Sequence, residues 1–365
     1  MLDGYRLMIP GPTQVSADVL CEMAKPIVPH YGPDWTAFYK ETMLLLGGVF
    51  GTEGKVFAVP GSGSAGLDAA FSSSADETDR WLVLSNGLFG ERLAAIARSY
   101  RPDAVVVNVP LTEQVTVECL RNALSEHPDT TAVAVVHSES SSGLLNPVRE
   151  LAQVCRERDL LFLVDGISSV GGIDLPMDEW GVDICITASQ KCLECPPGLA
   201  LVAVSSRGWE RIQHKVTPGW YLNLHVWEEY AEKWSDWHPY PITMAVPVFR
   251  AMRRALEIIL DEGLEARIRR HRESALWVRE QLAGLGYRAV FDASIASPTV
   301  LAFFAPDGLD SADVVRRMRS DHRILIANGM GEFRGKALRI GNMGPQTARE
   351  QMKPVIQALA AIAAG

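Results

Sequence analysis

The feature that most constrains the fold of this 365-residue chain is a series of short apolar runs, rich in β-branched residues. They recur at intervals of roughly 20 to 30 residues, which is the rhythm of strand–helix–strand units in a mostly parallel sheet. The predicted strands are residues 55–59, 81–84, 104–109, 132–136, 160–164, 184–188 and 199–204. We therefore expect a large α/β domain with a seven-stranded, mostly parallel sheet.

The strand rhythm stops after Ser205, and the rest of the chain is organised differently. A tryptophan-rich stretch over residues 220–237 leads into a long helical pattern over 246–285, which predicts one connecting helix. Strand-like runs at 299–304, 324–327 and 337–340 then alternate with helical ones at 311–320 and 346–364. We expect a large domain with an N-terminal arm (1–245), the connecting helix (246–285) and a smaller C-terminal α+β domain (286–365).

Composition excludes several classes of protein. With 47% hydrophobic and 22% charged residues, the chain has the composition of a globular protein. A formal net charge of −9 argues against a nucleic-acid partner, because such a protein needs a surplus of Lys and Arg. No apolar stretch approaches the length of a membrane span, so no membrane partner is expected. The six cysteines lie mostly in apolar surroundings, which favours a reducing, cytoplasmic location without disulfides.

Polar or glycine-rich loops follow most of the predicted strands. Ligands of open α/β sheets bind outside the carboxyl ends of the strands, so these loops should meet at one pocket. They cover residues 60–64, 85–87, 137–142, 165–169 and 189–191.

Two residues at this edge have complementary chemistry. Lys191 follows a strand and precedes apolar residues, where burial would leave its amine partly unprotonated and able to form an imine. Asp165 follows five apolar residues and could pair with a protonated pyridine nitrogen. Taken alone, Lys191 could be a solvent-facing loop residue and Asp165 a helix N-cap. Together they favour an enzyme that uses pyridoxal 5′-phosphate (PLP) as its cofactor.

The run Gly61-Ser-Gly-Ser-Ala-Gly66 follows a predicted strand and opens a helix. It matches the dinucleotide pattern G-x-G-x-x-G, but the next strand ends Leu84-Ser85-Asn86 without the acid that would bind a ribose. Small residues and hydroxyls at a helix N-terminus also suit a single phosphate. We favour a phosphate cradle, with a dinucleotide site or an ordinary glycine-rich turn as alternatives.

The ordered set of motifs resembles the class V aminotransferases of the fold-type I PLP enzymes, in particular the alanine–glyoxylate/serine–pyruvate branch. The resemblance covers nearly the whole chain. It includes Pro10-Gly-Pro12, the run 61–66, Ser85-Asn-Gly-Leu-Phe-Gly90, Glu139-Ser-Ser-Ser-Gly143, Val164-Asp-Gly-Ile-Ser-Ser169, Ser189-Gln-Lys-Cys-Leu-Glu-Cys-Pro-Pro-Gly198 and Leu338-Arg-Ile-Gly341.

The resemblance implies a role for each matching residue. Lys191 binds the cofactor covalently and moves the substrate proton, while Asp165 pairs with the pyridine nitrogen. Arg339 binds the substrate α-carboxylate, a task that suits guanidinium geometry. The other implied contacts are Ser62, Gly63, Ser64 and Gln190 with the phosphate, Phe89 stacked on the ring, Ser140 with the ring hydroxyl region or the substrate, and Tyr240 and Thr243 with the phosphate across a homodimer interface.

The C-terminal part is also similar to pyridoxamine–pyruvate aminotransferases, which act on a free vitamin. Two positions depart from that pattern. Ser62 stands where those enzymes have a glutamate, and Met330 where they have a second arginine. Both departures favour tightly held PLP over free pyridoxal.

Other PLP-dependent reactions are alternatives to amino transfer. PLP lyases and hydrolases share this fold. A cysteine desulfurase needs a reactive cysteine in a C-terminal loop, and none follows Cys195.

Cys192 and Cys195 form a C-x-x-C without a second pair, so we interpret them as small packing residues rather than metal ligands, with dithiol exchange as the alternative. The tryptophan-rich stretch suits either a dimer interface or a wall of the substrate pocket.

The sequence therefore predicts a PLP-dependent aminotransferase that uses no metal. It would move an amino group from a small amino acid such as alanine or serine to a 2-keto acid, glyoxylate or pyruvate.

Overall fold

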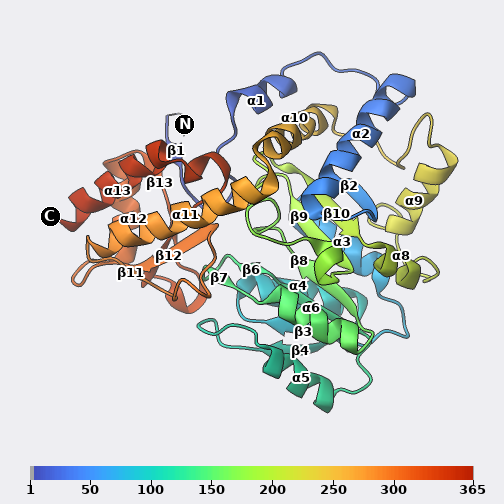
Figure 1. Ribbon diagram of the computed structural model, residues 1–365, viewed down its shortest axis with the longest axis horizontal. Coiled ribbons are helices and arrows are strands. Elements are labelled where there is room, and N and C mark those ends of the chain that lie inside the picture. The colour runs from blue at the N-terminus through green and yellow to red at the C-terminus, as the bar shows by residue number, and fades with distance from the viewer. Residues whose placement is uncertain (1–3, 365) are drawn as a thin grey trace.

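The computed structural model describes residues 4–364, and its largest element is a seven-stranded sheet (Figure 1). Its strands are β2 (Lys55–Gly61), β3 (Trp81–Ser85), β4 (Val105–Asn108), β5 (Ala132–Val136), β8 (Leu161–Asp165), β9 (Ile184–Ala188) and β10 (Gly198–Val204). They lie in the order β2-β10-β9-β8-β5-β3-β4, and only β10 runs antiparallel to its neighbours. The predicted seven-stranded, mostly parallel sheet is confirmed.

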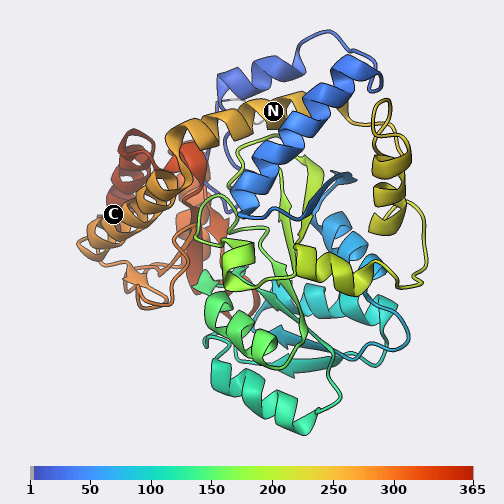
Figure 2. The same ribbon diagram turned by 45° about the vertical axis from the view of Figure 1, so that its right-hand side comes forward.

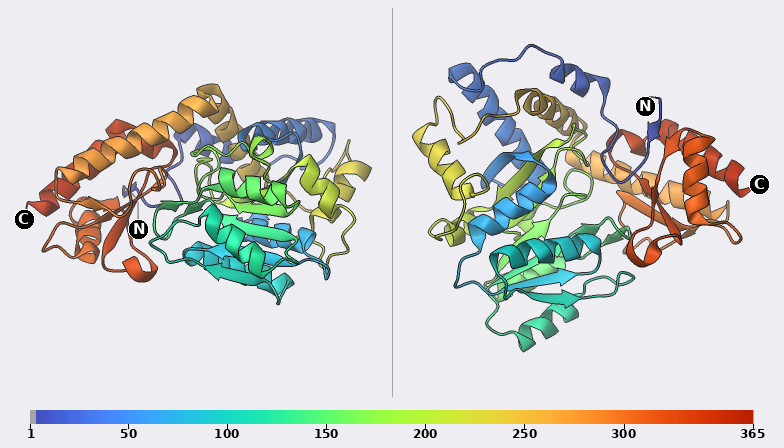
Figure 3. Two further views of the ribbon diagram at one scale, coloured as in Figure 1. Left: turned by 60° about the horizontal axis from the view of Figure 1, so that its bottom comes forward. Right: turned by 180° about the vertical axis from the view of Figure 1, so that it is seen from behind.

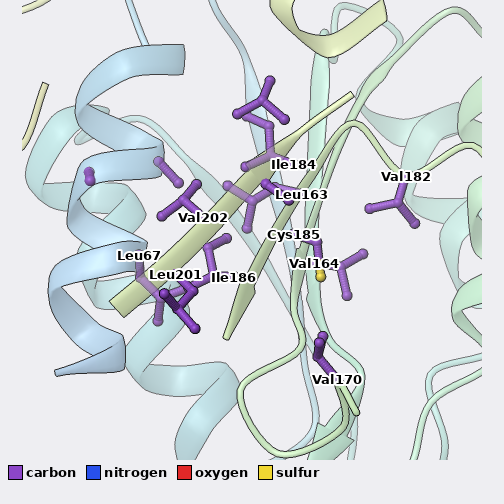
Figure 4. Packing of buried hydrophobic residues seen from close by; sticks show 14 of the residues in the cluster. Leu67, Leu163, Val164, Val170, Val182, Ile184, Cys185, Ile186, Leu201 and Val202 are labelled. Carbon is purple, nitrogen blue, oxygen red and sulfur yellow. The ribbon is translucent and has the colours of Figure 1, made fainter. Parts of the chain in front are cut away.

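The interior of this sheet is buried on both faces. Every residue of β3, β5, β8 and β9 is buried, which explains why these strands are continuous apolar runs rather than alternating ones. Figure 4 shows Leu163 and Ile186 from neighbouring strands packed with Leu67 in one core. A rigid sheet of this kind fixes where each following loop begins.

Helices from the first 233 residues surround the sheet. The N-terminal pair α1 and α2 lies beside the later helix α10 (Val246–Glu262), as Figure 2 shows. The helices are α1 (Ala17–Met23), α2 (Pro33–Phe50), α3 (Gly63–Ser74), α4 (Leu88–Tyr100), α5 (Val117–Glu126), α6 (Val148–Glu157), α7 (Met177–Trp180), α8 (Ser206–Ile212) and α9 (Leu224–Lys233).

The single connecting helix predicted over residues 246–285 is wrong, because the segment forms two helices. The first, α10, ends at Glu262, and α11 (Leu264–Ala283) follows directly. Gly263 between them has φ 81° and ψ 131°, which is far from helical geometry. The missed signal was this glycine, which breaks an otherwise helical pattern.

The C-terminal segment forms a second layer beside the large sheet, and the views in Figure 3 agree on this arrangement. Its antiparallel sheet has the order β11-β12-β15-β14. The elements are β11 (Arg288–Ala289), β12 (Val300–Phe304), α12 (Ser311–Ser320), β13 (Ile324–Leu325), β14 (Ala327–Asn328), η1 (Gly331–Phe333), β15 (Ala337–Gly341), η2 (Gly344–Thr347) and α13 (Arg349–Ala363). The strand predicted at 324–327 is thus divided between two sheets.

The N-terminal strand β1 (Arg6–Leu7) pairs in parallel with β13, and Met8 is buried in the C-terminal core. This core is separate from the larger one around the seven-stranded sheet. A short hairpin, β6 (Ser138–Glu139) with β7 (Leu144–Leu145), lies between the two regions. The exact domain boundaries stay a prediction.

No helix within residues 4–364 combines the length and the apolar character needed to cross a bilayer.

Candidate active site

One pocket of about 270 Å³ opens at the carboxyl ends of the parallel strands, where the sequence predicted it. Seven of the eleven predicted site residues line it, contributed by four different loops or helices. They are Ser62, Gly63, Ser64, Phe89, Asp165, Gln190 and Lys191. Ser140, Arg339, Tyr240 and Thr243 do not line it.

Lys191 lies in the turn after β9, with its amine directed at the N-terminal segment. Its Nζ donates a hydrogen bond to the carbonyl of Pro10, and Thr13 binds the Lys191 carbonyl through its hydroxyl at 3.2 Å. Gly11 makes this approach possible, because a Cβ there would lie 2.6 Å from Nζ. Burial lowers the pKa of Lys191 to about 8, and the positive charges of Arg339 and Arg92 act in the same direction. With this pKa about a tenth of the amine is neutral, and hence nucleophilic, at pH 7, against well under one part in a thousand for an ordinary lysine.

Asp165 is the last residue of β8 and is almost fully buried at the floor of the pocket. The Ile167 N–H donates to Oδ1 at 2.9 Å. Burial raises the pKa of Asp165 to about 7, and nearby Glu139 acts in the same direction. A buried carboxyl group with this pKa is prepared to accept a cationic partner, because such a partner would stabilise its charged form.

The predicted phosphate cradle has the expected local structure. β2 ends at Gly61, and α3 begins at Gly63 with Ser62 as its N-cap. The Ser62 side chain makes no capping hydrogen bond, so the first N–H groups of α3 are left for another acceptor. The Gln190 Oε1 atom is also buried without a partner among residues 4–364, so its carboxamide is free to turn its amino group toward a phosphate. These donors fit a phosphate monoester.

Phe89 and Arg92, near the N-terminal end of α4, both line the pocket. The Arg92 guanidinium lies 5.0 Å from the centre of the Phe89 ring. Glu139 holds this helix end, because its carboxylate accepts the Gly90 N–H at 3.0 Å and the Ser141 N–H at 3.0 Å. Arg92 was missed in the sequence, although its position three residues after Phe89 places both on one helix face.

Two further pocket residues missed in the sequence, Ser138 and Ser168, belong to loops that were already singled out. Ser140, which was predicted to contact the ring hydroxyl region or the substrate, is not among the residues that line the pocket, and its contact with a ligand stays a prediction. Its hydroxyl donates to the Ser168 hydroxyl at 2.6 Å. In this structure Ser140 supports Ser168, which faces the pocket.

Arg339 lies in the middle of β15, outside the pocket lining but close to it. Its Nε donates to the Asn328 carbonyl at 2.9 Å, and its Nη1 donates to the Ser140 carbonyl. Burial lowers the pKa of Arg339 to about 10, and Glu139 opposes this shift. Among residues 4–364, its Nη2 has no hydrogen-bond partner. One edge of the guanidinium is therefore fixed and one nitrogen is left for a ligand.

Tyr240 and Thr243 lie outside the pocket of their own chain, and their predicted contact with a phosphate across a dimer interface stays a prediction. Tyr240 is fully buried, and its hydroxyl accepts a hydrogen bond from the Trp35 indole and donates to the His30 carbonyl. Thr243 is exposed. For Tyr240 to contact a phosphate on another chain, its hydroxyl would have to give up a bond made within its own chain.

Cys192 and Cys195, which follow the lysine, are both fully buried. Each thiol is directed at a backbone carbonyl, of Ser168 and Val248 respectively, at 3.7 Å. Burial raises the pKa of Cys192 to about 12. Such thiols are chemically quiet, which agrees with a packing role.

A nucleophilic lysine, a buried carboxyl group and a phosphate cradle at one end of this sheet define a class, the fold-type I PLP enzymes. When bound, PLP supplies an electron sink for the carbanion that forms as a substrate loses its Cα proton. The chain's own residues hold the cofactor, orient the substrate and move that proton.

Comparisons with known proteins identify the family. A model of the class V aminotransferases matches residues 61–332. An uncharacterised aminotransferase of Methanocaldococcus jannaschii is 36% identical over 339 residues, which is 93% of this chain and 87% of that protein. The chain belongs to the class V aminotransferases, which are PLP-dependent enzymes, so the predicted family, fold and cofactor are confirmed.

Solved structures agree with this assignment. The alanine–glyoxylate aminotransferase from Nostoc sp. superposes with a TM-score of 0.93 at 33% identity, covering 98% of this chain and 95% of that one. The pyridoxamine–pyruvate aminotransferase from Mesorhizobium loti gives 0.92 at 29% identity, covering 98% of this chain and 92% of the other.

Proposed function

We propose that this aminotransferase takes its amino group from a small amino acid of the alanine or serine type and passes it to glyoxylate or pyruvate. The observation that carries the proposal is the pocket of about 270 Å³ that Lys191 and Asp165 share with the phosphate cradle. With PLP in a pocket of this size, a small substrate side chain is favoured. The named activity of the Nostoc relative supports the same pair of substrates.

In this proposal Lys191 binds the cofactor and then carries the proton away from the substrate Cα. Asp165 pairs with the pyridine nitrogen and keeps it protonated. Gln190, Ser62, Gly63 and Ser64 hold the phosphate, and Phe89 stacks on the ring. The free Nη2 of Arg339 binds the substrate α-carboxylate.

A second candidate is amino transfer from free pyridoxamine to pyruvate, which the Mesorhizobium relative performs according to its name. The intact cradle at the start of α3 argues against it, because a free vitamin has no phosphate to bind there. Met330, which is half-buried in the loop before η1, supplies no second cation for the keto acid.

We also propose that the enzyme works as a cytoplasmic homodimer. Trp234 and Trp237 are half exposed and in mutual contact, and Tyr31 packs against Trp237. None of these rings lines the Lys191 pocket, which favours an interface over a pocket wall. Light scattering should give twice the chain mass, whereas a monomer at micromolar concentration would contradict the dimer.

The activity is tested by a half-reaction. The purified protein is loaded with PLP, and candidate donors are added one at a time without a keto acid. We expect the visible band of the bound cofactor to bleach with alanine or serine, and to return when glyoxylate or pyruvate is added. No band with PLP but a band with free pyridoxal would favour the second candidate, and no band with either compound would contradict both.

A further inference from the structure

Glu194, three residues after the catalytic lysine, has an unusual backbone conformation. Its φ is 55°, in the left-handed region that residues with a Cβ seldom occupy. Two other non-glycine residues within 4–364 share this feature, Asp159 and Arg323, and both are exposed. Glu194 is the buried one, with 9% of its surface accessible. A strained, buried charge is retained only where the surroundings require that geometry.

The partner of Glu194 is Arg267 on α11, which is 1% exposed. Arg267 forms an ion pair with the Glu194 carboxylate and donates to the carbonyl of Cys192 at 2.7 Å. Its Nε donates to the Gly171 carbonyl, also at 2.7 Å. One guanidinium thus binds the loop that carries Lys191 and the loop that follows Asp165.

The same contacts reach the segment that follows the Arg339 strand. The Glu194 carboxyl lies against Gly344, where a Cβ would be 2.2 Å from the carboxyl carbon. Arg270, one turn after Arg267, donates to the Gly344 carbonyl at 2.8 Å. Glu262, at the end of α10, binds Arg267 at 2.9 Å and Arg270 at 2.8 Å. The charges alternate in sign, so each is compensated.

His271 also links α11 to Gly344, in the segment after β15. Its Nδ1 faces the Arg267 carbonyl at 2.8 Å, and its Nε2 faces the Gly344 N–H at 3.1 Å. A carbonyl requires a donor and an N–H requires an acceptor, so the ring is neutral with its proton on Nδ1. Burial lowers the pKa of His271 to about 3, which agrees. One face of α11, which runs between the two regions in Figure 1, therefore contacts both the loop that carries Lys191 and the segment that follows the Arg339 strand.

We propose that Glu194 and Arg267 are positioning residues that set the location of Lys191 relative to Arg339. The inference rests on the proposed function, in which Lys191 reacts at the substrate Cα while Arg339 holds the carboxylate. Lys191 follows a strand of the large sheet and Arg339 lies in β15 of the smaller one, and the Glu194–Arg267 pair joins the loop that carries Lys191 to the segment after β15. A substrate that engages both groups at once depends on this spacing, whereas a ligand that engages one of them does not.

The geometry favours positioning over simple stabilisation. A buried ion pair contributes little net stability, because desolvation offsets the attraction. A glycine at position 194 would adopt the same φ without strain. The chain instead has a glutamate whose carboxylate contacts α11 and the segment after β15 together.

The test is a double-mutant cycle of Glu194→Gly and Arg339→Ala in the PLP-loaded enzyme. In the wild-type background, Glu194→Gly should lower kcat/KM for the amino acid donor about 10- to 100-fold, because small misplacements of reacting groups have effects of this size. In the Arg339→Ala background the same change should lower kcat/KM less than about 3-fold, because the spacing no longer matters once the carboxylate anchor is gone.

The lysine loop and the carboxylate-binding arginine are also measured separately. The rate at which PLP attaches to the cofactor-free protein reports the lysine loop, and the Kd of propionate, which is alanine without its amino group, reports Arg339. The PLP attachment rate and the Kd of propionate should both stay within about 3-fold of the wild type in Glu194→Gly, since PLP attachment needs only Lys191 and propionate needs only Arg339. The control is Asp79→Asn, which removes the buried carboxylate that pairs with Lys215 before the start of β3, at the opposite end of that strand from the pocket loops, and should leave all three quantities unchanged.

An equal fall of kcat/KM in both backgrounds, or a loss of propionate or PLP binding, would overturn the positioning role. If Glu194→Gly does not fold, the pair Glu194→Gln with Arg267→Met is used, since it removes both charges together. A wild-type enzyme that transfers no amino group from any α-amino acid would instead refute the proposed function, and this inference with it. An additive cycle in an active enzyme refutes this inference alone.

Discussion

The two halves of the site are built in different ways. The proposed cofactor half consists largely of residues at or just after the ends of strands of one sheet, such as Asp165, the last residue of β8, and Lys191 in the turn after β9. The proposed substrate half depends on Arg339, whose guanidinium donates hydrogen bonds to the carbonyls of Asn328 and Ser140 from two other segments. Reactive chemistry can thus be specified by short stretches of sequence, whereas substrate choice depends on how distant segments meet.

Removing the lysine should produce the largest effect in the cofactor half. In Lys191→Ala no amine is left to bind PLP covalently or to move the substrate proton, so kcat should fall by at least about 1,000-fold. The visible band of the cofactor should disappear as well. Lys25→Ala, at an exposed lysine paired with Glu22, is the control and should be fully active. Retained turnover in Lys191→Ala would show that the reactive group lies elsewhere.

Asp165→Asn should have the next largest effect. The asparagine keeps the shape and can still accept the Ile167 N–H, but it cannot carry the charge that stabilises a protonated pyridine ring. We expect kcat to fall about 100-fold or more, as for other preorganised electrostatic groups in active sites. The measurement is kcat at saturating donor, with the PLP content determined separately. A loss explained entirely by lower PLP content would reduce Asp165 to a binding residue.

A change in the substrate half should be milder and of a different kind. Arg339→Ala should raise KM for the amino acid and the keto acid roughly 10- to 100-fold, the range expected for hydrogen bonds to a charged group. The band of bound PLP should be unchanged, which separates the two halves. An unchanged KM with normal kcat would remove Arg339 from the site.

The same contrast explains how much could be predicted from the sequence. The seven strands and the residues in the loops after them, including Lys191, Gln190 and the run 61–66, follow from local patterns. The break at Gly263 and the division of residues 324–327 between two sheets depend on tertiary contacts that no short window contains. The same is true of the hydrogen bond between Ser140 and Ser168, and of the Arg267–Glu194 pair, whose members are far apart in the chain.

The smallest predicted effect concerns stability of the cofactor-free protein. The pKa of Asp165 is about 7 in the folded chain against an ordinary value of 3.8, so between these values the folded state binds more protons than the unfolded one. The contribution of Asp165 to the free energy of unfolding therefore falls as pH rises from about 4 to 7 and stays low above that. Asp165→Asn should then raise Tm by a few °C at pH 8 and change it little near pH 4. A Tm that falls equally at both pH values would contradict the assigned pKa.

The central claim is that the lysine at the carboxyl end of β9 carries the cofactor. The most direct measurement is to load the protein with PLP, reduce it with borohydride, digest it and map the labelled peptide by mass spectrometry. The account predicts a single pyridoxyl-phosphate adduct on Lys191. An adduct on another lysine, or none in a protein that still transfers amino groups, would contradict it.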